Sequence, residues 1–101
     1  MRVVAVGTSD FVTVFKLCGV EAIEVSSPRE MLDVIKRLVK QRDIGLILVE
    51  KRLCDEVSND VTQLKLNYPV PVITEIPGIQ EGGKLRKNYM DLLKQALGYG
   101  G

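Results

Sequence analysis

The sequence contains no histidine and no tryptophan, and it has only two cysteines among its 101 residues. Without histidine, the chain lacks the side chain that most often acts as a general base or a metal ligand. Cys18 and Cys54 each occupy an apolar position of a helical pattern. We therefore expect both to be small buried residues with reduced thiols, and we expect neither a cofactor nor a metal site.

Long apolar segments are missing as well. No apolar run approaches the ~20 residues that span a membrane, and Met-Arg-Val-Val at the start leads directly into a predicted strand instead of a signal peptide. These features predict a cytoplasmic protein without direct membrane insertion.

The chain also lacks an excess of one charge, because 14 Lys and Arg against 13 Asp and Glu give a net charge of +1. The charge is unevenly placed: residues 1–83 carry −2 and residues 84–101 carry +3. The basic end is too weak for the footprint of a nucleic-acid-binding domain. We expect no nucleic-acid partner.

The chain is organised around the apolar run Ile44–Glu50, in which five of seven residues are Ile, Leu or Val. A strand that is apolar on both faces has to be covered on both faces, as in the centre of a parallel sheet. Helical patterns precede and follow the run, and another short apolar run lies beyond each of them. This alternation predicts a small doubly wound α/β domain of the flavodoxin or receiver type.

The remaining elements follow from the same periodicities. Strands are predicted at Arg2–Val6, Glu21–Val25, Ile44–Glu50 and Val70–Ile76, and helices from Thr8–Asp10 to Leu17, over Pro28–Gln41, over Lys51–Asn67 and over 84–97. Right-handed crossovers with the first strand beside the third give the parallel order 2-1-3-4. The domain organisation is then a core at 1–77, a glycine-rich linker at 78–83, and an amphipathic helix with its tail at 84–101.

Two of these helices carry start signals. At Thr8–Asp10 a hydroxyl or carboxylate can accept hydrogen bonds from the first free N–H groups of the helix. Ser27 and Glu30 satisfy a capping box, with Pro28 at the first helical position.

The segment Gly78–Lys84 matches the spacing of a phosphate-binding P-loop, but its context argues against that function. Leu85 stands where a Ser or Thr would hold Mg²⁺, and Glu81 places a negative charge among the expected phosphates. A flexible connection is the better interpretation.

A second candidate site lies at the carboxyl ends of the first and third strands, where open α/β sheets usually bind ligands. The polar residues expected there are Thr8, Ser9, Asp10, Glu50, Lys51 and Arg52. A receiver-type acid cluster would need paired acids in the first loop and an aspartate after the third strand. The sequence offers Asp10 and Glu50, which fit helix caps and a solvated rim better; no catalytic residue is assigned.

The last predicted helix has an apolar face that includes Leu85, Tyr89, Leu92 and Leu93. Three other helices are already available to cover a four-stranded sheet. Part of this face is therefore a candidate contact for another chain.

Several segments together resemble the F subunit of the V-type and A-type ATPases of archaea and bacteria. They are Val3–Gly7, Phe15–Val20, Asp43–Arg52 and Tyr68–Pro77. The resemblance covers nearly the whole chain. It implies a flavodoxin-like, non-catalytic central-stalk subunit, cytoplasmic and peripheral to the membrane. It also implies binding to the coiled-coil rotor protein of the stalk, the D subunit, and a C-terminal helix that reaches the catalytic head and modulates ATP hydrolysis coupled to proton or sodium transport.

Two alternatives remain at this point. One is a free-standing receiver-like signalling or adaptor domain. The other is a small phosphate-binding enzyme that uses the loop Gly78–Lys84.

Overall fold

The computed structural model describes residues 1–77. Within this range the elements are β1 (Arg2–Gly7), α1 (Ser9–Leu17), β2 (Glu21–Glu24), α2 (Pro28–Leu38), β3 (Ile44–Glu50), α3 (Lys51–Asp55), α4 (Ser58–Asn67) and β4 (Val72–Ile76). The expected linker at 78–83, the expected helix at 84–97 and the P-loop-like segment lie outside the described residues. No helix in the described range is long and apolar enough to cross a membrane.

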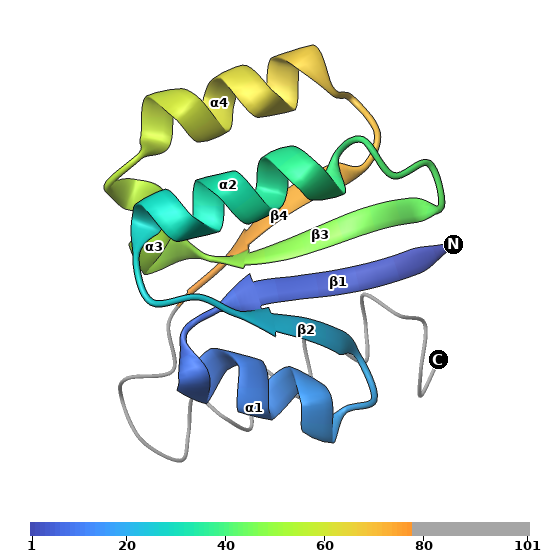
Figure 1. Ribbon diagram of the computed structural model, residues 1–101, viewed down its shortest axis with the longest axis vertical. Coiled ribbons are helices and arrows are strands. Elements are labelled where there is room, and N and C mark those ends of the chain that lie inside the picture. The colour runs from blue at the N-terminus through green and yellow to red at the C-terminus, as the bar shows by residue number, and fades with distance from the viewer. Residues whose placement is uncertain (78–101) are drawn as a thin grey trace.

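The strands form one four-stranded parallel sheet in the order β2-β1-β3-β4, as predicted (Figure 1). β1 and β3 lie inside the sheet, which explains why both are continuously apolar. β2 and β4 form its edges. Ala5 pairs with Leu48, and Leu48 pairs with Thr74, so these three residues share one face.

The two faces of the sheet carry separate apolar clusters because side chains alternate along each strand. On one face Val4, Ile47 and Val49 pack with buried residues of α2, α3 and α4. On the other face Ala5 and Leu48 pack with buried residues of α1. Figure 1 shows α1 on one side of the sheet and the other three helices on the opposite side.

Local sequence explains how α1 ends and how α2 begins. In α1, Phe11 and Phe15 are buried with ring centroids 4.6 Å apart, and Gly19 takes the positive φ of 81° that ends the helix turn. In α2, the Ser27 hydroxyl accepts a hydrogen bond from the Glu30 backbone N–H at 3.1 Å, as the capping box predicts. The Glu30 carboxylate, however, accepts from the backbone N–H and hydroxyl of Ser26 instead of from Ser27.

The predicted helix over Lys51–Asn67 is wrong as a single element. The chain leaves the helical conformation at Val57, with φ −132° and ψ 36°, so α3 and α4 are separate helices. Leu53 and Val61 are nevertheless both buried, as the apolar spacing requires. Hydrophobic spacing reports which residues are buried and is insensitive to a break between two turns.

Smaller differences concern the ends of elements. α2 ends at Leu38 instead of Gln41, and β2 ends at Glu24 instead of Val25. β4 begins at Val72 instead of Val70. Pro69 and Pro71 have no N–H to donate to a neighbouring strand, which shortens the ladder at its start.

Candidate functional site

The carboxyl edge of the sheet is organised by Glu50, the last residue of β3. Glu50 is a charged residue, yet it is only 2% exposed. Its Oε1 accepts hydrogen bonds from the backbone N–H and from the hydroxyl of Thr8, both at 2.8 Å. Because charge-assisted hydrogen bonds are among the stronger ones, Glu50 fixes the turn between β1 and α1.

The residue that allows this approach is Gly7, at the end of β1. A Cβ atom at position 7 would lie 2.7 Å from Cγ of Phe11 and 2.9 Å from Oε1 of Glu50. Both separations are shorter than real Cβ contacts allow. Gly7 is therefore required by the close approach of the Phe11 ring on one side and the Glu50 carboxylate on the other.

The second oxygen of Glu50 is also engaged. Oε2 forms an ion pair with Nη2 of Arg52 at 3.2 Å, and the Arg52 side chain remains 48% exposed. Nζ of Lys51 pairs with Oδ1 of Asp55 at 2.9 Å, and this hydrogen bond raises the pKa of Lys51. The charged side chains at the start of α3, Lys51 and Arg52, are thus paired with carboxylates of the same domain.

Of the predicted edge residues, Thr8, Glu50 and Arg52 are brought together, whereas Ser9 and Asp10 are exposed. The capping prediction at Thr8–Asp10 is wrong for Thr8: this residue occupies the N-cap position, but its side chain makes no capping hydrogen bond. Its hydroxyl donates to Glu50 instead. Across residues 1–77, no three side chains of the His, Cys, Asp and Glu types gather to hold a metal ion. The other predicted contact residues, Leu85, Tyr89, Leu92 and Leu93, lie outside the described residues.

At the other end of the sheet, where the strands begin, Arg2 links the first three strands. The sequence patterns did not indicate this role. Its guanidinium forms two hydrogen bonds to Glu21, at 2.8 and 3.1 Å, one to Asp43 at 2.9 Å and one to Gln41 at 3.1 Å. The Arg2 hydrogen bond lowers the pKa of Asp43, and the two carboxylates raise the pKa of Arg2. The sequence signal that could have revealed this network is that Arg2, Glu21 and Asp43 each lie at or next to the start of one of the first three strands.

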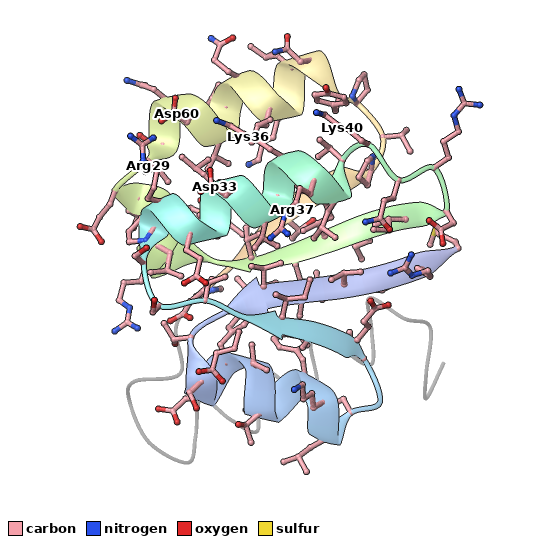
Figure 2. All side chains as sticks on the ribbon, in the orientation of Figure 1. Arg29, Asp33, Lys36, Arg37, Lys40 and Asp60 are labelled. Carbon is pink, nitrogen blue, oxygen red and sulfur yellow. The ribbon has the colours of Figure 1, made fainter. Side chains whose placement is uncertain are left out.

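A third charged region covers the outer surface of α2 and the adjacent part of α4 (Figure 2). We define the α2–α4 surface by six exposed charged residues: Arg29, Asp33, Lys36, Arg37, Lys40 and Asp60. None of the six forms an ion pair with another residue of the described range. All four basic residues of this surface are exposed.

The two predicted cysteine environments differ. Cys54 is buried, and desolvation, reinforced by the nearby Glu75 carboxylate, raises the pKa of its thiol to about 12. Cys18 is only half-buried, so the prediction of a buried residue is wrong at this position. The prediction of a buried residue is confirmed for Cys54. Its thiol stays neutral and is therefore a poor nucleophile, so Cys54 contributes to packing.

Comparison with known proteins gives one consistent result. The family model described as "ATP synthase (F/14-kDa) subunit" matches residues 3–93. The F subunit of the A-type ATP synthase from Methanococcus aeolicus is 32% identical over 101 residues, covering 97% of this chain and 96% of the relative. The corresponding F subunit from Pyrococcus abyssi is 39% identical over 82 residues, covering 76% of this chain and 75% of the relative.

A solved structure supports the fold. The F subunit of the V-type ATP synthase from Archaeoglobus fulgidus aligns with a TM-score of 0.50 at 21% identity, covering 74% of this chain and 95% of that one. At this identity the likeness concerns the α/β fold alone.

Proposed function

Because the chain belongs to the F-subunit family of the ATP synthases, we propose that it is a non-catalytic subunit of the central stalk of a V/A-type ATP synthase. In this role it binds the coiled-coil stalk protein, the D subunit, and turns with it. It resides in the cytoplasm, at the membrane periphery, as part of the complex.

The observation that carries this proposal is the closed carboxyl edge. In open α/β sheets this edge is the usual ligand site. Here the Glu50 carboxylate is buried and both of its oxygens are engaged by Thr8 and Arg52. An edge filled by the protein's own groups suits a domain that acts through its outer surface. It offers little support for a receiver-like phosphoacceptor site, since the third strand ends in a carboxylate that is already in use.

A binding experiment tests the stalk assignment. The purified full chain is mixed with the purified coiled-coil stalk protein from the same complex, and complex formation is followed by size-exclusion chromatography. A stable complex is expected. If the two proteins elute separately, the central-stalk assignment is wrong.

We propose further that residues 84–101 modulate ATP hydrolysis by contacting the catalytic head. The support comes from sequence: an apolar face with Leu85, Tyr89, Leu92 and Leu93, and a local charge of +3. Deleting residues 84–101 should leave assembly with the stalk intact and change the ATPase rate of the reconstituted complex. An unchanged rate would contradict the regulatory role.

The same preparation tests the phosphate-binding alternative. A ligand present at a hundred times its dissociation constant stabilises a protein by about 2.7 kcal/mol, so millimolar Mg-ATP would visibly raise the melting temperature if binding were micromolar. We expect no shift. A shift that Lys84→Ala abolishes would support nucleotide binding by the segment Gly78–Lys84.

A further inference from the structure

The basic residues of the described domain fall into two groups: those that form an ion pair within the domain and those that do not. Arg2, Lys51, Arg52 and Lys65 each form an ion pair within the domain. The four basic residues of the α2–α4 surface have no such partner anywhere in the described range. Their positive charge is therefore available to another molecule.

These residues also form an ordered row. Arg29, Asp33, Lys36 and Lys40 are separated by four, three and four residues, so they follow one side of α2 and of the turn after it (Figure 2). At 1.5 Å per residue, Arg29 and Lys36 lie about 10 Å apart along the helix axis. The signs along the row are plus, minus, plus, plus. Arg37 lies beside the row, and Asp60 of α4 lies across from it (Figure 2).

The helix dipole does not explain the whole row. Lys36 and Arg37 in the last turn are favourable for the helix dipole, but Arg29 is at the opposite end, where a positive charge is unfavourable. Lys36 lies in the last turn of α2 and Lys40 in the turn that follows, and these two like charges repel each other. An external partner with the opposite signs would relieve this repulsion.

We propose that the α2–α4 surface binds an acidic stripe along one helix of the coiled-coil stalk protein, which makes this surface the stalk-binding face of the domain. The identity of the partner depends on the proposed function. A spacing of four, three and four keeps charged residues along one side of an α-helix, so a helix of the stalk protein can run alongside the row and meet each of its charges. The proposal places stalk binding on the helical surface instead of the carboxyl edge, where Glu50, Lys51 and Arg52 are paired within the domain.

The mixed signs favour a protein helix over a phosphate-bearing partner. Asp33 lies within the basic row and Asp60 lies opposite it. Both would repel the uniformly negative backbone of a nucleic acid or the headgroups of an anionic membrane. A helix with acidic residues at matching spacing, and one basic residue opposite Asp33, satisfies every charge of the row.

The test measures the dissociation constant of the full chain and the purified coiled-coil stalk protein by calorimetry at two salt concentrations. The test variant is Lys36→Glu with Lys40→Glu. Lys16→Glu is the control, because Lys16 is an exposed residue of α1 on the opposite side of the sheet. Asp10→Lys tests the competing carboxyl edge. Thermal melting of each variant verifies that it is folded.

We expect the double variant to weaken binding at least about tenfold and to reduce its salt dependence, whereas Lys16→Glu changes it less than about twofold. Binding by the double variant within twofold of the natural chain would overturn the inference. So would equal weakening by Lys16→Glu, or weakening by Asp10→Lys alone. If the natural chain itself fails to bind the stalk protein, the proposed function fails instead. Binding of the natural chain to anionic vesicles or oligonucleotides but not to the stalk protein would overturn both.

Discussion

Replacing Glu50 with Ala should destabilise the domain more than any surface substitution. The change removes the acceptor of two hydrogen bonds from Thr8, each at 2.8 Å, and leaves that backbone N–H half-buried without its partner. Hydrogen bonds to a charged group contribute roughly 1.5–3 kcal/mol, and breaking a fully buried ion pair costs roughly 3–5 kcal/mol. Because Arg52 stays hydrated when Glu50 is removed, we expect a loss of about 2–4 kcal/mol in the free energy of unfolding.

Urea unfolding of the full chain measures this loss, with two further variants to locate it. Glu50→Gln keeps an acceptor oxygen of similar shape and should cost less than Glu50→Ala. Thr8→Val removes only the hydroxyl and should cost about 1 kcal/mol. A double-mutant cycle between positions 8 and 50 should give a clear coupling energy, because the two residues are in contact. If Glu50→Ala costs less than about 0.5 kcal/mol, as an ordinary surface substitution does, the assignment of Glu50 as the organiser of this edge is refuted.

Three further changes test other parts of the structure. Gly7→Ala should destabilise the domain by about 1–3 kcal/mol, because the added methyl group meets Phe11 and Glu50; a neutral result in urea unfolding would show that both can move aside. In a Cys18→Ser variant at pH 8, iodoacetamide should modify Cys54 far more slowly in the folded chain than in the chain unfolded by urea. The reason is that the Cys54 thiol is buried and its pKa is raised to about 12. Equal rates of modification would contradict its burial. The hydrogen bonds from Ser26 lower the pKa of Glu30, so their contribution to stability is complete above the unfolded pKa of about 4.3 and is lost as the pH falls through the lower folded value. Between about pH 5 and pH 3, Glu30→Gln should therefore lose less free energy of unfolding than the natural chain. Parallel losses would be inconsistent with the pKa shift.

The sheet could be predicted from the sequence because its determinants are local. Ile44–Glu50 is apolar on both faces, and the helical patterns on either side leave few ways to connect neighbouring strands. The order 2-1-3-4 then follows from right-handed crossovers once the first strand is placed beside the third. These features depend on the periodicity of apolar residues, which is readable without any knowledge of long-range contacts.

The break at Val57 was not predicted because periodicity does not measure backbone continuity. Leu53 and Val61 would be buried by one long helix or by two shorter ones. A local signal was present, since Ser58 and Asn59 favour helix starts over helix interiors. The regular apolar spacing favoured one continuous helix and outweighed this local signal in the prediction.

The geometry of the carboxyl edge was only partly predictable. The sequence placed Thr8 and Glu50 at the same edge, but a threonine before a helix is equally suited to cap it. Its actual partner lies 42 residues away in the chain. The requirement for Gly7 likewise arises from two side chains that approach from different elements, Phe11 of α1 and Glu50 of β3. Contacts of this kind depend on the folded arrangement and leave no local pattern.

The distribution of charge argues that the α2–α4 surface and the C-terminal segment act separately. The α2–α4 surface has four basic and two acidic residues, and residues 84–101 carry a net charge of +3. Two regions of the same sign do not attract each other, so we expect the tail not to cover this surface, and its proposed partner is the catalytic head instead of the stalk protein. Deletion of 84–101 should therefore change the dissociation constant for the coiled-coil stalk protein less than about twofold, and its effect should add to that of Lys36→Glu with Lys40→Glu, as effects at independent sites do. Calorimetry on the deletion, the double variant and their combination measures this. A deletion that restores binding to the double variant, or that abolishes binding in the natural chain, would show that the tail and the α2–α4 surface form one site.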